Sequence, residues 1–241
     1  MSHGFAALLL VIAGNLSCAA NAAEAPVVAP FSATEPGVSL PAPWKLATLP
    51  KISRQTRYAL VRDGDAVVLR ADADASMAGV AHPLKLDVRT HPVIEWRWKV
   101  MNLLKKSDIA AKQGDDYPAR VYVLFDYDIR KLPFSVRAKI RLARLVGADI
   151  PLAALCYVWD GKAAAGTSVW SVYTDRVRVI VAESGAANLG KWVTIRRDVA
   201  ADFRAAFGED PPAISGVVLA TDTDNTGESA TAFYGDIRFV Q

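Results

Sequence analysis

Short apolar runs separated by turn residues recur along most of this 241-residue chain, for example RYALV, PVIEWRWKV, ARVYVLFDY, VRVIVA and ATAFYGDIRFV. Many of their residues are β-branched or aromatic, which is typical of strands. About ten such runs occur without regularly interposed helices, which favours an antiparallel sandwich over a parallel α/β sheet. We therefore predict an all-β fold, an antiparallel β-sandwich of jelly-roll type with one or two peripheral helices.

Alternating patterns predict which strand faces form the core. In the run at 93–100, a period of two places four apolar side chains on one face: Ile94, Trp96, Trp98 and Val100. The same period in the last run separates Phe233, Ile237 and Phe239 from Tyr234, Asp236 and Arg238. We expect the four apolar side chains of the first run to pack in the core and the two sets of the last run to lie on opposite faces of its strand.

Two segments read as helices. The stretch RDVAADFRAAFG has Asp198 at the N-cap position and Gly208 at the C-terminal stop, with Pro211 preventing continuation. The stretch FSVRAKIRLARLVG has an apolar stripe and several basic residues, among them Arg137, Arg141 and Arg144. Such a basic helix can rest on an anionic surface, but a solvated outer face is the simpler interpretation.

The N-terminal residues 1–22 are typical of a signal peptide. The apolar run Phe5–Gly14 is shorter than the roughly 20 residues of a membrane span, and Ala20-Asn21-Ala22 fits a cleavage site. Cys18 suggests a lipid anchor, yet Asn15 stands where an aliphatic residue is needed, so lipid anchoring is the less favoured alternative. We expect a periplasmic or secreted protein without a transmembrane helix in the mature chain. Residues 23–43 form a Pro/Ala-rich arm, and residues 44–241 form one sandwich domain.

Composition and motifs exclude several classes. The chain has 28 basic and 25 acidic residues, so nothing in the charge favours nucleic acid as a partner. After cleavage Cys156 is the only cysteine, and we expect a buried thiol. Nucleophile elbows, zinc-protease motifs and phosphate-binding loops do not occur, and His82 and His91 each precede a proline, which favours structural roles.

The loop sequence DTDNTG offers a first candidate site, with Asp222, Asp224, Asn225 and Thr226. It begins like a calcium loop, in which alternate oxygen side chains converge on one ion. The match then fails, because Thr226 occupies the fifth position and Phe233 the twelfth. Three interpretations remain: a turn held by its own side chains, a metal site with Asp222 and Asp224 as ligands, or direct contact with an organic ligand.

The sequence GDDYPAR offers a second candidate site, with Asp115, Asp116, Tyr117 and Arg120. Adjacent carboxylates repel each other unless a cation offsets their charge, and Arg120 can do so through its paired N–H donors. The segment is either an ion-paired loop that fixes the start of a strand or part of a polar binding or catalytic cluster.

Taken in order, WRWKV, GDDYPARVYVLFD, YVW, RRDVAADFRAAFGEDPPAISGV and TDTDNTG with AFYGDI resemble the secreted bacterial family described as domain of unknown function 3047. The resemblance covers roughly residues 40–240. That family has no assigned reaction, so the resemblance implies no catalytic residues. A YGDI strand after an acidic loop is also similar to galactose-binding-like jelly rolls of carbohydrate-binding modules, a likeness of fold that does not establish function.

We therefore expect an exported, non-catalytic protein that binds a saccharide or another cell-envelope ligand, with calcium as the candidate cofactor. The site would join the 115–120 segment to the 222–226 loop, Tyr234 and Asp236. One alternative is a glycan hydrolase or lyase that uses carboxylates from 115–116 and 222–236. A second alternative is a structural envelope protein that docks through its basic helix.

Overall fold

The computed structural model describes residues 26–49, 52–145 and 151–241. The predicted signal peptide, residues 1–22, lies outside these ranges, so export stays a prediction. Within the described part of the chain, no helix has the length and apolar character needed to cross a bilayer.

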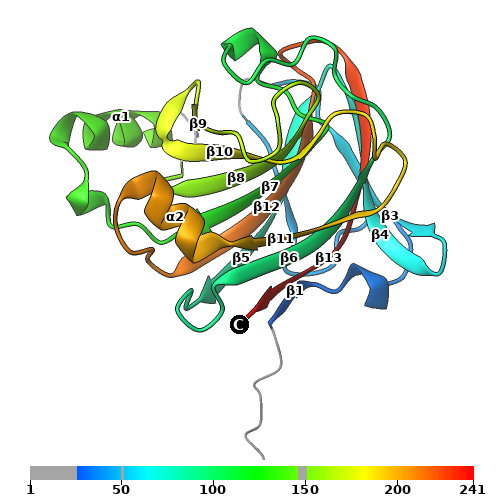
Figure 1. The fold of residues 1–241 in the computed structure, drawn as a ribbon, viewed down its shortest axis with the longest axis horizontal. Helices are drawn as coiled ribbons and strands as arrows, with labels where there is room; N and C mark the ends of the chain where they lie inside the picture. The colour runs from blue at the N-terminus through cyan, green and yellow to red at the C-terminus, as the bar shows by residue number, and fades with distance from the viewer. Residues whose placement is uncertain (1–25, 50–51, 146–150) are drawn as a thin grey trace, which may run out of the picture.

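Two packed sheets form the molecule (Figure 1). Sheet A has the strand order β11-β6-β13-β4-β3, with β1 paired to β13. Its strands are β1 (Val27–Ala29), β3 (Arg57–Asp63), β4 (Ala66–Asp74), β6 (Val93–Val100), β11 (Val193–Asp198) and β13 (Ser229–Val240). Sheet B has the order β2-β5-β12-β7-β8-β10-β9. Its strands are β2 (Lys45–Ala47), β5 (Met77–Leu86), β7 (Ala119–Phe125), β8 (Ala154–Asp160), β9 (Ser168–Ser171), β10 (Thr174–Ser184) and β12 (Ile214–Asp222).

The predicted all-β sandwich with peripheral helices is confirmed. All strand pairs are antiparallel except β8 and β10, which run parallel with Cys156 opposite Val179. The chain returns between these two strands through a connection that contains β9, because parallel neighbours cannot be joined by a tight hairpin.

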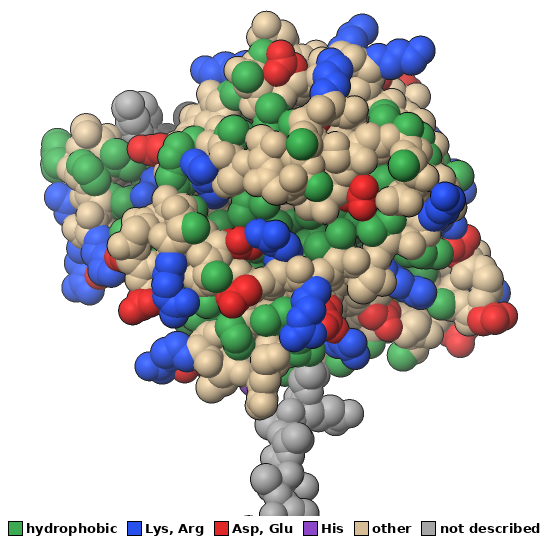
Figure 2. Space-filling view, in the orientation of Figure 1, with side chains coloured by type: hydrophobic (Ala, Val, Ile, Leu, Met, Phe, Trp, Pro, Cys, Tyr) green, Lys and Arg blue, Asp and Glu red, His purple; other side chains and the backbone are tan. Residues whose placement is uncertain are grey.

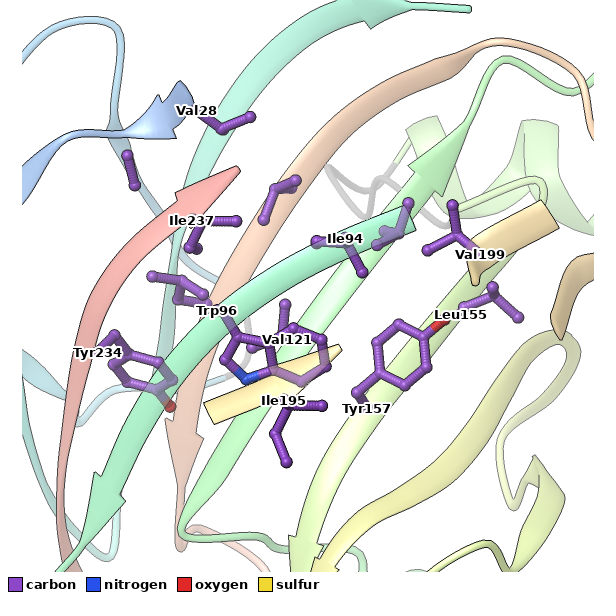
Figure 3. Packing of buried hydrophobic residues seen from close by; sticks show 14 of the residues in the cluster. Val28, Ile94, Trp96, Val121, Leu155, Tyr157, Ile195, Val199, Tyr234 and Ile237 are labelled. Atoms are coloured by element: carbon purple, nitrogen blue, oxygen red, sulfur yellow. The ribbon is translucent and has the colours of Figure 1, made fainter. Parts of the chain in front are cut away.

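Aromatic side chains from both sheets meet in the core (Figure 3). The ring centres of Trp96 and Trp98 lie 5.3 Å apart at nearly a right angle. The ring centre of Tyr157 lies 5.3 Å from that of Trp96, and the ring centre of Trp159 lies 6.0 Å from that of Trp98. The contact between Trp96 and Trp98 has the edge-to-face geometry that aromatic pairs favour, and the other two pairs are tilted. The predicted burial of Ile94, Trp96, Trp98 and Val100 is confirmed.

The final strand corrects one prediction. Tyr234 is buried in the core, whereas Phe233 lies on the outer face of sheet A near Lys99. The reason is a β-bulge: Tyr234 lies opposite Trp98, but Trp96 is reached only at Ile237, so β13 contains an extra residue there. The extra residue shifts the alternation by one position, so Tyr234 shares the buried face with Ile237 and Phe239, and Phe233 lies on the opposite face.

The two predicted helices are present as α1 (Phe134–Leu145) and α2 (Val199–Phe207), with short 3₁₀ turns at Phe31–Ala33, Lys112–Gly114 and Ile129–Lys131. Asp198 caps α2 by accepting a hydrogen bond from the Ala201 amide, and Gly208 ends it in the left-handed conformation at φ 72°, as predicted. The ring centre of Phe203 of α2 lies 4.6 Å from that of Phe125. The side chains of Arg141 and Arg144 lie outside the described part of the structure.

Candidate functional site

The two predicted acidic segments converge at one end of sheet B, because β7 and β12 are neighbours with Arg120 opposite Ala220. Arg120 donates from Nε to Oδ1 of Asp222 at 2.7 Å and from Nη2 to Oδ2 of the same carboxylate. Its Nη1 lies 3.6 Å from Oδ1 of Asp115. The predicted role of Arg120 as the compensating cation is confirmed, and its principal partner is Asp222 from the other segment.

The Arg120 guanidinium is enclosed. It lies 4.5 Å from the centre of the Tyr117 ring, and its Nη1 donates to the Tyr122 hydroxyl at 3.2 Å. Nη2 also donates to the backbone oxygen of Asp115. Each side of this cation therefore has an aromatic or oxygen partner, as a buried charge requires. Nearby Cys156 is buried as predicted, and its burial raises the pKa of the thiol to about 12.

Asp116 ties the first segment to the loop of the second. One carboxylate oxygen accepts from the amide and the side chain of Asn225, at 3.3 and 2.9 Å, and the other accepts from the Thr226 amide at 2.6 Å. The loop closes on itself through the Gly227 amide, which donates to the Thr223 oxygen at 2.9 Å. Gly227 has φ +68°, a conformation that side chains other than hydrogen disfavour. The loop is thus held by Asp116 as well as by its own turn.

Most of the predicted site is closed to solvent. Asp116 is fully buried, Asp222 is 2 % exposed and Arg120 is 5 % exposed. The other buried members are Asp115, Tyr117 and Thr226. Asn225 is exposed and Asp224 is partly exposed, so these two residues carry the cluster to the surface.

Three carboxylates lie close enough to share a cation. Asp116, Asp222 and Asp224 each offer an oxygen within 4.8 Å of the others. Oδ1 of Asp224 is buried and has no hydrogen-bond partner among the described residues. Burial raises the pKa of Asp222 to about 7, against the effect of Arg120, and burial together with Asp116 raises the pKa of Asp224. Oxygen ligands of this kind suit a hard cation such as calcium.

Tyr234 and Asp236, the last two predicted site residues, lie outside the polar cluster. The Tyr234 hydroxyl lies beneath the site in the core, where it donates to the Ala220 oxygen at 2.6 Å and lies 3.0 Å from Oγ1 of Thr221. Asp236 does not join the cluster. Its carboxylate accepts from the amide and the hydroxyl of Ser32, at 2.9 and 2.5 Å, and so fastens the N-terminal segment to sheet A.

Two residues that the sequence did not single out complete the surface of the site. Tyr173, in the turn between β9 and β10, is 56 % exposed. Its hydroxyl donates to the Lys112 oxygen or to Oδ1 of Asn225, each at 3.1 Å. Nζ of Lys112 lies 5.5 Å from the centre of the ring. No local pattern distinguishes a tyrosine in such a turn, because the contact with Asn225 spans 52 residues of sequence.

A hollow lies elsewhere on the molecule. A groove of about 740 Å³ runs between β2 and β3, at the open edge of the sandwich. It is lined by Val38, Leu40, Trp44, Lys45, Leu46, Thr56, Arg57, Tyr58, Ala59 and Asp72. None of the predicted site residues lines it, so the polar cluster and this groove are separate features.

Residues 42–238 match a family described as "Protein of unknown function (DUF3047)". The chain belongs to this family. No curated protein matches the sequence.

Two solved structures are similar to this chain. One is the family 11 carbohydrate-binding module of the cellulosomal cellulase Lic26A-Cel5E of Clostridium thermocellum, with 10 % identity and a TM-score of 0.41 over 90 % of this chain and 94 % of that chain. The other is the family 11 module from the same organism in complex with a beta-1,3-1,4-mixed-linked tetrasaccharide, with 10 % identity and a TM-score of 0.40 over 84 % and 91 % of the two chains.

Proposed function

We propose that this protein is an exported, non-catalytic binding protein for a saccharide or another cell-envelope ligand. The ligand would bind at the surface formed by Tyr173, Lys112, Asp224 and Asn225, above the buried Arg120–Asp222 pair. The observation that carries the proposal is the exposed, fixed ring of Tyr173 beside these polar groups.

The geometry of Tyr173 suits a sugar. Its hydroxyl is held by the backbone oxygen of Lys112 and by Oδ1 of Asn225, so the ring keeps one orientation in a residue that is more than half exposed. A pre-organised ring loses little freedom on binding and offers an apolar plane to the C–H face of a pyranose. Asn225 and Asp224 stand beside it as hydrogen-bonding groups for hydroxyls.

The contacts of the carboxylates support binding rather than turnover. Glycoside hydrolysis needs two carboxyl groups that face the scissile bond. Asp222 is engaged by Arg120, and Asp116 is engaged by the amides of Asn225 and Thr226, and both carboxylates are buried. The hydrolase or lyase alternative would have to free one of them.

Calcium is part of the proposal. The ligand atoms would come from Asp116, Asp222 and Asp224, whose three negative charges, with that of Asp115, exceed the one positive charge of Arg120. A divalent cation would offset the excess and occupy the free oxygen of Asp224. Its effect would be to rigidify the loop that presents Asn225 to the ligand.

Isothermal titration of the mature chain against a panel of neutral envelope glycans, with and without calcium, tests the proposal. We expect binding that Tyr173→Ala abolishes and that Tyr173→Phe weakens less, because phenylalanine keeps the ring but loses its anchor. Phe134→Ala is the matched control, since Phe134 is a 73 % exposed aromatic residue on α1. Flat titrations throughout, or equal binding by Tyr173→Ala, would overturn the proposal.

Two further measurements test the enzyme alternative and the predicted export. Release of sugars from any panel glycan, lost in Asp116→Asn, would establish the enzyme alternative. N-terminal sequencing of protein recovered from the periplasm or the medium tests export, and we expect the mature chain to begin at Ala23. Retention of residues 1–22 would contradict a cleaved signal peptide.

A further inference from the structure

Aromatic and cationic side chains alternate across the outer face of sheet A. Lys99 of β6 lies opposite Phe233 of β13, which lies opposite Arg70 of β4. Nζ of Lys99 lies 4.6 Å from the centre of the Phe233 ring and 5.2 Å from that of Trp192, which directly precedes β11. Arg70 lies 5.8 Å from Phe233 on its other side. The row therefore crosses three strands and ends at the residue before β11, and the rings hold the cations in place.

Four of the other five cations of this face have carboxylate partners; the fifth, Arg57, lies on the edge strand β3. Lys99 donates to both oxygens of Asp63 at 2.7 Å, and Arg70 lies 2.9 Å from Asp72. Glu95 is shared by two arginines, Arg196 of β11 and Arg238 of β13. The positive charges of these four side chains are therefore offset by neighbouring carboxylates.

Arg97 differs from them. Among residues 26–49, 52–145 and 151–241, no carboxylate lies within ion-pair distance of its guanidinium. The guanidinium lies 4.7 Å from the centre of the Trp192 ring. Beneath it is Gly235, where a Cβ atom would stand 2.5 Å from Cγ and Nε of Arg97. The absence of a side chain at 235 thus lets Arg97 lie flat between the bulge of β13 and the indole.

We propose that Arg97 anchors a second binding surface, one for the acidic group of an anionic saccharide: a uronate carboxylate, a sulfate or a phosphate ester. A guanidinium presents a planar fork of donors that matches such groups, and here the fork is pre-oriented by Trp192 and not occupied by an ion pair. This surface is independent of Tyr173, which lies on sheet B.

Charge favours the same class of ligand. Six cations, Arg57, Arg70, Arg97, Lys99, Arg196 and Arg238, share this face with the carboxylates of Asp63, Asp72, Asp74, Glu95 and Asp236. Asp74 is paired with Arg54, and Asp236 is bonded to Ser32. Blue and red side chains mingle over the lower centre of Figure 2, where β6, β11 and β13 lie in Figure 1. Among the described residues of β4, β6, β11 and β13, no large hydrophobic side chain is exposed, which favours a polar polymer over a lipid surface.

Affinity electrophoresis and titration calorimetry of the mature chain with polygalacturonate, and with neutral dextran as reference, test this inference. We expect binding to polygalacturonate that weakens with salt and that falls at least about tenfold in Arg97→Gln, because one charge-assisted paired contact is lost. Arg97→Lys keeps the charge but not the paired N–H donors, so its affinity for polygalacturonate should lie between those of the wild type and Arg97→Gln. Arg204→Gln, a 54 % exposed arginine on α2, is the matched control.

Outcomes separate this surface from the one at Tyr173. Tyr173→Ala should leave polygalacturonate binding unchanged, and Arg97→Gln should leave the binding of neutral glycans unchanged. An unaltered thermal midpoint in Arg97→Gln would show that the loss is not unfolding. If Arg97→Gln binds polygalacturonate as the wild type does, or if the chain binds only phosphatidylglycerol vesicles, the inference is wrong.

Discussion

Arg120 and Arg97 lie on the outer faces of the two sheets, and each packs on an aromatic ring, 4.5 Å from Tyr117 and 4.7 Å from Trp192. Arg120 is sealed and holds both oxygens of Asp222, whereas Arg97 is partly exposed and has no carboxylate partner among the described residues. A buried charge needs an opposite charge or hydrogen-bond partners from the protein, whereas an exposed charge is stabilised by water. Burial thus commits the first arginine to the fold and leaves the second free to bind.

The largest effect should come from breaking the buried pair. Arg120→Met leaves the carboxylate of Asp222 buried without its cation, and we expect the free energy of unfolding to fall by about 3–5 kcal/mol. Arg70→Met removes an arginine whose side chain is 45 % exposed and should cost less than about 1 kcal/mol. Urea denaturation of both variants checks this contrast, and equal losses would refute it.

A smaller loss should follow when Asp116 is truncated. Asp116→Ala leaves the amides of Asn225 and Thr226 without their acceptor, so we expect a cost of about 1–3 kcal/mol. Hydrogen exchange should show the Thr226 amide exchanging faster while amides of β6 stay protected. Continued protection at Thr226 would mean that the loop does not depend on Asp116.

Asp224 should give an effect whose sign depends on calcium. Without the ion, Asp224→Asn removes repulsion from Asp116 and should raise stability by up to about 1 kcal/mol, since the partly exposed group is screened by water. With calcium, the wild type should become the more stable chain, because the variant has lost a ligand oxygen. Thermal unfolding with calcium and with a chelator checks the reversal, and the same sign in both buffers would exclude calcium here.

The pH dependence sharpens the same test. The pKa of Asp224 is raised in the folded state, so over some pH range the folded chain holds a proton that the unfolded chain has lost. Stability linked to that proton is present at low pH and is lost as the pH rises through the raised pKa. Calcium-free wild type should therefore lose stability relative to Asp224→Asn on going from pH 4 to pH 8. A constant difference across this range would contradict the raised pKa.

The smallest stability effect is expected at Gly235. The added methyl of Gly235→Ala would meet Arg97, which can move at a cost of about 0.5–1 kcal/mol for an altered side-chain rotamer. The displacement should weaken polygalacturonate binding and alter the fluorescence of Trp192 without affecting neutral glycans. Unchanged polygalacturonate binding would mean that the flat position of Arg97 is not needed.

Much of the fold was predictable because it depends on local periodicity. The alternation in β6 correctly predicted the burial of Trp96 and Trp98, and Asp198 and Gly208 correctly marked the ends of α2. The alternation in β13 failed at Phe233 and Tyr234, because a bulge there adds one residue. A lone glycine in a strand does not reveal such an insertion, since the bulge is defined by the partner strand.

The site was predictable only where charge demanded a partner. Arg120 had to compensate a carboxylate, and the neighbouring positions of β7 and β12 made that carboxylate Asp222. The degree of burial was not predictable, because it depends on loops folding over the outer face of sheet B. Tyr173 was missed for a similar reason, since its contacts with Lys112 and Asn225 come from distant parts of the chain.

The bulge in β13 has a different consequence for each arginine. Tyr234 reaches through the core to Ala220 and Thr221, which support the strands that carry Arg120 and Asp222. The next residue, Gly235, has no side chain, and the side chain of Arg97 packs directly against its backbone. Deleting Gly235 would turn the bulge into regular strand, with Tyr234 and Ile237 two positions apart and both still on the core face. Tyr234 would then keep its contacts, whereas Arg97 would lose the gap in which it lies. The bulge is thus needed for the position of Arg97 but not for the contacts of Tyr234, so the Arg97 surface can change while the support beneath Asp222 stays.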